Sequence, residues 1–393
     1  PAQCEAIGDE QFYDERPKRS DRNEGDDTNT QLSNVGLSIY DEFKEVVLLT
    51  RVHRKSQIAK PQTEEDRQYN ERAGKFWDIV DRLRDADLTI DDYMELCKRK
   101  HARLPLQQRL FFSDAPMLMD FRRVSENNPD QNCDFFNQQK LRSHAKEHKL
   151  PVIAFDAVHE NCQQSEGMEM DESCFMGLPN HLEVCVSAPV LLIHNLATEH
   201  GLNNGSQGAI KEIQYEAGAH PNHERLRMRM PCTIIVDFPG YTGPPFFDEA
   251  DQRTFVPLQP RTVASKEDRE AMRAQFPLTL AWALTPWKAQ GMTLAKERLK
   301  IGNSVEKPGV LFTSLTRIRH PDTLMLDDQF PSYHQIMKVR NHPSFELRQR
   351  WERKLRAKFS RTIRRHMRDP KEYAPDAVWT ADDSMLADSL LRF

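Results

Sequence analysis

Three polar side chains in one short stretch have the types and the spacing to bind an anion. Lys288, Gln290 and Thr293 bring a positive charge, an amide and a hydroxyl close together in the chain. They follow residues 278–284, where Leu and Trp alternate with Thr and Ala, the period of two that indicates a β-strand. The sequence therefore predicts a phosphate-contacting site at the end of a strand. The alternative is a buried strand followed by an ordinary loop.

The residues after this strand predict a short capped helix. Thr285 is a preferred N-cap residue, and Pro286 is favoured at the first helical position. Gly291 can adopt the positive φ that ends a helix. A strand that leads into a helix N-terminus directs unpaired N–H groups beyond the strand end, where an anion can bind. Trp287 could stack on a nucleic-acid base or pack in the core, and the sequence leaves both open.

Arginines occur in or beside apolar segments at three further places. Arg54 follows residues 46–49, which predict a short buried strand, and Arg317 lies in a second apolar segment. A guanidinium is always charged and planar, so it can stabilise charge that spreads over phosphate oxygens. Arg227 lies in residues 225–230, where three arginines share one face of a predicted strand and could hold a phosphate backbone. In each case a solvated surface charge is the alternative.

Several of these segments together resemble one known family. The stretch LAWALTPWKAQGMTL (280–294) looks like the fifth conserved motif of the Pif-type, RecD-like DNA helicases of superfamily one, some of which belong to rolling-circle transposons. GVLFTSLTRIR (309–319) resembles the sixth motif, and TRVHRK (50–55) resembles the fourth. APVLLIHNLATEHGLNNGSQG (188–208) is similar to the start of a small barrel inserted in the second motor domain. The motifs occur in the family's order over most of the chain.

The resemblance implies roles for particular residues. Arg317 matches the arginine finger, Arg54 matches the arginine that reaches the γ-phosphate, and Gln3 matches the glutamine that senses it. Gln290 and Gly291 would help to line the nucleotide site. The residues expected to contact DNA are Lys288, Thr293, Trp287, Asn204 and Arg227. Asn137 matches a polar residue that lines the cleft.

The chain departs from the family at several positions. His53 and Lys55 replace a Phe and a Gln, Thr316 replaces a Ser, and Pro286-Trp287 replaces an Ile-His pair. Neither the GxxxxGKS/T phosphate loop nor the acidic magnesium-binding motif occurs in the 393 residues. We therefore expect a C-terminal portion of a longer motor, with ATP and Mg²⁺ held mainly by the missing part. The alternative is a single-stranded nucleic-acid-binding or interaction module without ATPase activity.

The expected fold is α/β, with a RecA-like motor domain whose parallel sheet is flanked by helices and interrupted by a small β-barrel. We divide the chain into a remnant of the first motor domain (1–40), the first part of the second motor domain (41–180), the barrel (181–276), the last part of the motor domain (277–330) and a basic helical tail (331–393). Leu347, Trp351, Leu355 and Phe359 form the apolar stripe of the tail helix. Its basic faces could bind DNA, RNA or an acidic partner.

Composition narrows the class of protein. The formal net charge of −5 confines any nucleic-acid site to a local basic groove. Seven cysteines without a CxxC pair indicate free thiols in a reducing compartment. No apolar run approaches the roughly 20 residues that cross a bilayer, so no membrane partner is expected. The spacing of His159, Cys162 and Cys174 matches no zinc module, and no metal ligands are assigned.

The expected partners are single-stranded DNA and forked duplex. By resemblance, the motor would work as a monomer in the 5′ to 3′ direction, in repair, recombination, telomere maintenance or transposition. The nucleus is the expected compartment, with the mitochondrion as the alternative.

Overall fold

The computed structural model describes residues 35, 38–39, 42–47, 55–122, 132–216, 229–267 and 270–366, without the side chains of 363, 364 and 366. The chain divides into two compact units. The helical unit comprises residues 1–94, 303–320 and 331–393, and the sheet unit comprises residues 95–302 and 321–330. The domain boundaries predicted from the sequence stay a prediction.

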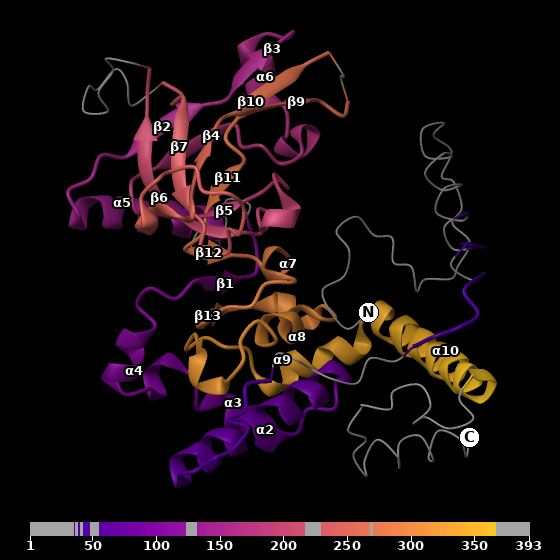
Figure 1. The fold of residues 1–393 in the computed structure, drawn as a ribbon. Coiled ribbons are helices and arrows are strands. Elements are labelled where there is room, and N and C mark those ends of the chain that lie inside the picture. Colours follow the sequence, from indigo (N-terminus) through magenta and orange to yellow (C-terminus); the bar gives the residue numbers. More distant parts are fainter. Residues whose placement is uncertain are drawn as a thin grey trace. The chain divides into compact units, whose positions relative to one another are not determined.

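A four-stranded parallel sheet forms one part of the sheet unit (Figure 1). Its order is β12 (Ala283–Leu284), β1 (Met117–Met119), β13 (Glu297–Lys300) and β14 (Leu324–Leu326), and every neighbouring pair is parallel. These strands are short and mostly apolar, as expected where both faces of a parallel sheet are covered. Helix α5 (Cys133–Glu147) packs on β12, and α7 (Pro286–Ala289) packs on β1. The predicted α/β class is confirmed.

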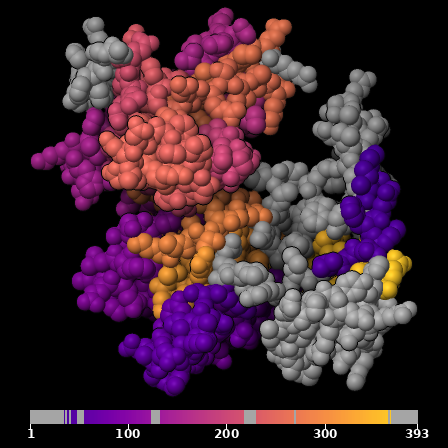
Figure 2. All heavy atoms as spheres, in the orientation of Figure 1, coloured from indigo at the N-terminus to yellow at the C-terminus, as the bar shows by residue number. Residues whose placement is uncertain are grey.

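A five-stranded antiparallel sheet contains a large apolar core. Its order is β11 (Leu278–Leu280), β5 (Pro189–Leu192), β6 (Gln207–Gln214), β7 (Thr233–Asp237) and β8 (Phe255–Leu258). Inward residues of these strands join one buried cluster. On the face drawn in Figure 2, the pink and salmon atoms of this part of the chain lie packed together. In the pairings of the described residues β11 and β8 are the edges, so closure into a barrel stays a prediction.

Two smaller sheets complete the strands of the sheet unit among the described residues. One is β3 (Val158–Glu160), β10 (Met272–Gln275) and β9 (Arg261–Ala264), and the other is β2 (Ile153–Asp156) with β4 (His181–Val184). Helix α6 (Gln164–Glu169) and the 3-10 turn η3 (Glu172–Phe175) lie in the same segment.

The helical unit is built on α2 (Glu64–Arg84), whose start carries a capping box between Thr63 and Asp66. The buried face of α2 includes Phe76, Val80 and Leu83 and packs against α8 (Val310–Leu315). The unit also contains α9 (Tyr333–Met337) and α10 (Pro343–His366). Two further α-helices are α3 (Ile90–Cys97), which starts in this unit, and α4 (Leu106–Phe111). Further 3-10 turns are η1 (His101–Arg103), η4 (Thr198–His200), η5 (Ala250–Gln252), η6 (Asn303–Glu306), η7 (Pro321–Thr323) and η8 (Lys338–Asn341).

The strand predicted for residues 46–49 is wrong for Val46 and Val47. Val46 and Val47 have no regular structure, and Val47 is 78% exposed. The backbone N–H of Val46 instead donates to the hydroxyl of Thr362 on α10 at 3.0 Å. An apolar run this short gains a strand only when a neighbouring strand pairs with it. Residues 48–49 lie outside the described part of the chain.

Candidate nucleic-acid interface

Residues 278–294 form two short strands and one helical turn. β11 pairs with β5 in the antiparallel sheet, whereas β12 pairs with β1 in the parallel sheet. The hydroxyl of Thr285 accepts the backbone N–H of Lys288 at 3.3 Å, Pro286 is the first helical residue, and Gly291 has a φ of 89°. The predicted capped helix is confirmed. The predicted single strand is wrong, because the chain crosses between two sheets at residues 281–282.

A buried asparagine holds this crossing in place. Asn137 of α5 is 4% exposed, and its amide N–H groups donate to the carbonyls of Leu280 and Ala283 at 3.3 and 3.1 Å. Its amide oxygen accepts the N–H of Ala283 at 2.7 Å. Backbone groups at the crossing that have no strand partner are satisfied in this way. Asn137 therefore fixes the direction in which β12 leads into α7.

A pocket of about 130 Å³ lies at the end of β12, and we call it the Lys288 pocket. Its polar lining includes the carboxylate Asp134 and the uncharged Thr279, Thr285, Asn137 and Asn204 beside the cations Lys288 and Arg122. Two residues predicted to contact DNA, Lys288 and Asn204, thus line one pocket. The cleft-lining position predicted for Asn137 also lies there.

The other predicted residues of this segment do not line the Lys288 pocket. Gln290, Gly291 and Thr293 are exposed or half-buried, and Trp287 is half-buried. No atom lies within 4 Å of where a Cβ on Gly291 would be, so its positive φ, not crowding, is what favours glycine there. The roles of these four residues in nucleotide and DNA binding stay predictions.

Positively charged groups around the Lys288 pocket lower the pKa values of their neighbours. Burial lowers the pKa of Lys288, and the positive charge of Arg122 lowers it further. The pKa of His194 is lowered by burial, against the effect of its bond to the Met176 carbonyl, and also by the charges of Arg261 and Lys288. These shifts show that several cations lie near one another. A phosphate in their midst would relieve this repulsion.

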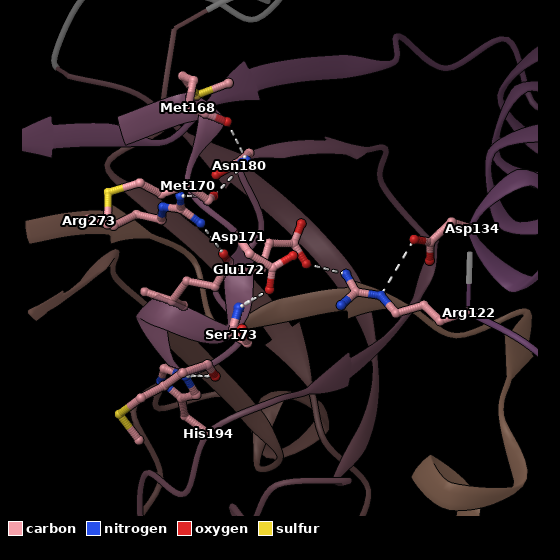
Figure 3. A network of polar contacts seen from close by, with 12 residues as sticks. Arg122, Asp134, Met168, Met170, Asp171, Glu172, Ser173, Asn180, His194 and Arg273 are labelled. Carbon is pink, nitrogen blue, oxygen red and sulfur yellow. Dashed lines mark hydrogen bonds and ion pairs between the residues drawn. The ribbon is translucent and has the colours of Figure 1, made fainter. Parts of the chain in front are cut away.

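Arg122 is held by carboxylates at the edge of the pocket (Figure 3). Its Nη2 donates to Oε2 of Glu172 at 2.6 Å, and its Nε lies 3.4 Å from Oδ2 of Asp134. The Glu172 side chain is 6% exposed, whereas that of Arg122 is 44% exposed. Arg122, Asp134 and Asn137 also line an adjoining groove of about 300 Å³. The guanidinium is therefore preorganised and still open to solvent.

No sequence motif predicted a role for Arg122. The available signal was its position, because it follows β1 directly, and ligands of parallel sheets bind beyond the carboxyl ends of the strands. That position indicates a site beside Lys288 only because β1 and β12 are parallel neighbours in the folded sheet. Their segments are far apart in the chain, so the sequence pattern alone could not bring Arg122 next to Lys288.

A second guanidinium, that of Arg273, belongs to the network of Figure 3. Arg273 is fully buried, and its Nε donates to Nε2 of His159 at 2.9 Å. Its other nitrogens donate to the carbonyls of Leu178, Gly167 and Met170. The guanidinium carbon lies 4.0 Å from the centroid of the Phe175 ring. This cluster fixes the small three-stranded sheet beside the Glu172 turn.

Arg317 lies in the helical unit, at the C-terminal end of α8. Its Nε donates to the carbonyl of Thr313 at 2.7 Å, and its Nη2 donates to the hydroxyl of Thr316 at 2.8 Å. The residue is 1% exposed. A positive charge at a helix C-terminus is stabilised by the helix dipole. The side chain is thus ordered on its own helix, and its role as an arginine finger stays a prediction.

Three predicted site residues, Gln3, Arg54 and Arg227, lie outside the described residues. Of the predicted strand 225–230, Arg229 and Met230 are described and are not in a strand. Within the described part of the chain no group of three or more His, Cys, Asp or Glu side chains could hold a metal ion. The described helices include none that is long and apolar enough to span a membrane.

Comparison with known proteins identifies several partial relatives of this chain. No family model matches the chain. The ATP-dependent DNA helicase PIF6 of Trypanosoma brucei brucei is 29% identical over 167 residues, which are 42% of this chain and 18% of the relative. The ATP-dependent DNA helicase PIF1 of Rattus norvegicus is 26% identical over 202 residues, 51% of this chain and 27% of the relative. The named relatives of this chain are Pif1-type DNA helicases. The expected family resemblance is confirmed.

A further relative and two solved structures extend the comparison. The uncharacterized protein 030L of Invertebrate iridescent virus 6 is 28% identical over 179 residues, 38% of this chain and 33% of the relative. The Pif1 helicase of Candida albicans has a TM-score of 0.47 at 20% identity and covers 72% of this chain and 58% of its own. Bacteroides Pif1 in complex with ADP-AlF3 and ssDNA has a TM-score of 0.47 at 18% identity, covering 82% and 58%. The chain spans a third or less of the length of the curated relatives it matches.

Proposed function

We propose that this chain is a C-terminal portion of an ATP-dependent DNA helicase and provides its phosphate-backbone contacts to single-stranded DNA. The observation that carries the proposal is the convergence of Lys288, Arg122 and Asn204 on one pocket beyond the end of β12. Such groups contact phosphate and do not read base sequence. Binding would therefore be tolerant of sequence and sensitive to salt. The names of the sequence relatives support the helicase part of the proposal.

ATP and Mg²⁺ are proposed cofactors of the longer protein. Arg317, Arg54 and Gln3 would form this chain's side of the nucleotide site, with Gln290 and Gly291 nearby. Of these, Arg317 has the chemistry to fit a phosphate, but its guanidinium is bonded to Thr313 and Thr316. It would have to leave these acceptors to reach a nucleotide. When bound, ATP would supply the energy for movement 5′ to 3′ along the strand.

The proposed partners are single-stranded DNA and forked duplex, with a monomeric motor acting in the nucleus or the mitochondrion. The second candidate function is a nucleic-acid-binding module that does not turn over ATP. The absence of a GxxxxGKS/T loop from these 393 residues favours it. For this chain alone, we expect weak, salt-sensitive binding to single strands and no ATPase activity. Turnover of ATP by the purified chain would contradict this expectation.

Replacing Lys288 tests the proposed interface directly. Lys288→Ala should weaken binding of a labelled oligothymidylate about tenfold, since one charge-assisted contact is lost. The slope of log affinity against log salt should fall in magnitude by about 0.7, the value for one phosphate contact on a single strand. Fluorescence anisotropy over a range of salt concentrations measures both quantities.

Lys266→Ala is the matched control for this experiment. Lys266 is exposed in the same unit, and it does not line the Lys288 pocket. Its replacement removes one positive charge and should leave both affinity and slope nearly unchanged. Equal effects of the two substitutions would show that only net charge matters, and the proposed interface would be wrong.

A further inference from the structure

A second and larger pocket lies at the opposite ends of the same parallel strands. It has a volume of about 690 Å³ and is lined by Pro116, which precedes β1, and by Trp282, which precedes β12. The Lys288 pocket instead lies beyond the carboxyl ends of these strands. The two pockets share no lining residue. We call the larger one the Trp282 pocket, and its volume is typical of sites that bind small molecules or parts of polymers.

Aromatic rings form one wall of the Trp282 pocket. The ring centroids of Trp282 and His144 are 5.6 Å apart, and those of His144 and His148 are 4.3 Å apart. Nε2 of His144 lies 2.8 Å from the hydroxyl of Ser187, which fixes the imidazole. Trp282 and His144 are both half-buried, so each ring keeps a surface for a ligand. Planar π-faces of this kind stack on nucleobases without regard to sequence.

The charge of the Trp282 pocket is suited to an anion. Lys140 of α5 lines the pocket, is half-buried and makes no ion pair with a described residue. Burial lowers the pKa of Lys140, and the charge of Arg298 lowers it further, against the opposite effect of Glu147. Glu147 also lines the pocket, but it is exposed.

The two aspartates that line the Trp282 pocket are already neutralised. Asp114 is paired with Lys296, and Oδ2 of Asp237 lies 3.2 Å from Nζ of Lys211. The hydroxyl of Thr254 also donates to Asp237. Lys140 is therefore a half-buried lining charge that can still bind a ligand; its ammonium lies 5.7 Å from the centroid of the Phe136 ring. An anionic group next to an aromatic wall is the chemistry of a nucleotide unit.

We propose that the Trp282 pocket is a second contact site for single-stranded nucleic acid, with a base against Trp282 and His144 and a backbone phosphate on Lys140. The inference deepens the proposed function and rests on its claim that the partner is a single strand. Because the two pockets lie at opposite ends of β1 and β12, each contributes its own contacts to affinity. Effects of substitutions in the two pockets should therefore add as free energies.

The test compares two substitutions in the Trp282 pocket with one on the same helix outside it. Lys140→Ala should lower the affinity for a labelled oligothymidylate about tenfold and reduce the magnitude of the salt slope by about 0.7. His144→Ala should lower affinity about fivefold without changing the slope, because stacking carries no charge. Lys146→Ala removes an exposed charge from the same helix, and it should change neither quantity. Thermal unfolding of each variant verifies that the fold is intact.

The Lys288→Ala variant separates this inference from the proposed function. If Lys140→Ala behaves like Lys146→Ala while Lys288→Ala weakens binding, the Trp282 pocket does not contact the strand and only this inference fails. If neither Lys140→Ala nor Lys288→Ala weakens binding, the proposed function fails too. In the double variant Lys140→Ala/Lys288→Ala the fold-losses should multiply to about 100-fold. A double variant no weaker than Lys288→Ala alone would overturn the second site.

Discussion

The two positively charged residues of the proposed interface, Lys288 and Arg122, are far apart in the chain. Lys288 follows β12, and Arg122 follows β1, yet the charge of one lowers the pKa of the other. Glu172 and Asp134 hold the guanidinium of Arg122 without closing it off from solvent. A bound phosphate would compete with these carboxylates for the N–H groups of the Arg122 guanidinium. Removal of either carboxylate would therefore change how Arg122 is positioned.

A histidine in the neighbouring network gives a pH dependence that can be measured. Nε2 of His159 accepts a hydrogen bond from Arg273, so the imidazole there is neutral, with its other proton directed at Gln164. Burial lowers the pKa of His159, and the charge of Arg273 lowers it as well. The unfolded state then binds more protons, and the free energy of unfolding falls as pH drops. The stabilisation that neutral His159 gives should be fully present above about pH 6.5, the ordinary pKa of histidine. It should be lost as the pH falls below that value.

Denaturant unfolding at several pH values measures this contribution. His159→Gln removes the titrating group and should flatten the decrease in the free energy of unfolding between about pH 7.5 and 5.5. His181→Gln is the control, because His181 is exposed and pairs with Asp156 at the surface. An unchanged pH dependence in His159→Gln would show that Arg273 does not hold His159 in its neutral form.

Helix α10 carries both a buried arginine, Arg348, and exposed arginines such as Arg356. The predicted apolar stripe is confirmed in part: Trp351 is buried, whereas Leu347, Leu355 and Phe359 are only half-buried. Arg348 lies outside this stripe, where the sequence predicts exposed basic residues, and is nevertheless buried. Its side chain is 2% exposed because its guanidinium donates to the carbonyl of Arg84 at the end of α2.

The two kinds of arginine on α10 should differ in their effect on stability. Arg348→Ala should lower the free energy of unfolding by about 2 kcal/mol, since it leaves the Arg84 carbonyl without this donor and removes packing over the Phe345 ring. Arg356→Ala removes the same charge from an exposed position and should change it by less than about 0.5 kcal/mol. Chemical denaturation measures both. Similar values would mean that Arg348 does not anchor the helix.

At the scale of the whole molecule, the proposed motor needs residues that this chain does not contain. The curated relatives are longer, and the match covers a third or less of each. Arg317, which follows the C-terminal end of α8, is the described residue that the family resemblance connects most directly with the nucleotide. Its guanidinium donates to acceptors at its own helix end, so its test belongs in a longer protein that also carries a phosphate loop.

In such a protein, Arg317→Ala should reduce ATP turnover by about 1,000-fold or more, as expected for loss of an arginine finger. Affinity for single-stranded DNA should stay nearly unchanged, because the Lys288 pocket is built without Arg317. Arg319→Ala, at an exposed neighbouring position, is the control. Steady-state ATPase and anisotropy assays measure the two quantities. Equal losses of turnover and of binding would contradict the catalytic role.

The sequence by itself determined the local features of the site. Thr285, Pro286 and Gly291 specify a capped helical turn through contacts within a few residues, and such contacts can be read from residue type and spacing. The alternation in residues 278–284 indicated extended backbone for the same reason, and both short strands there are extended. The order of the motifs along the chain also indicated the family to which the named relatives belong.

Only the tertiary structure decided which side chains meet. The crossing of residues 281–282 between two sheets, the Asn137 bonds that hold it, and the approach of Arg122 to Lys288 all depend on partners far away in the chain. The same is true of the buried Arg348. An arginine or asparagine looks the same in a sequence whether it is solvated or buried, because burial is set by long-range packing and not by neighbours in the chain.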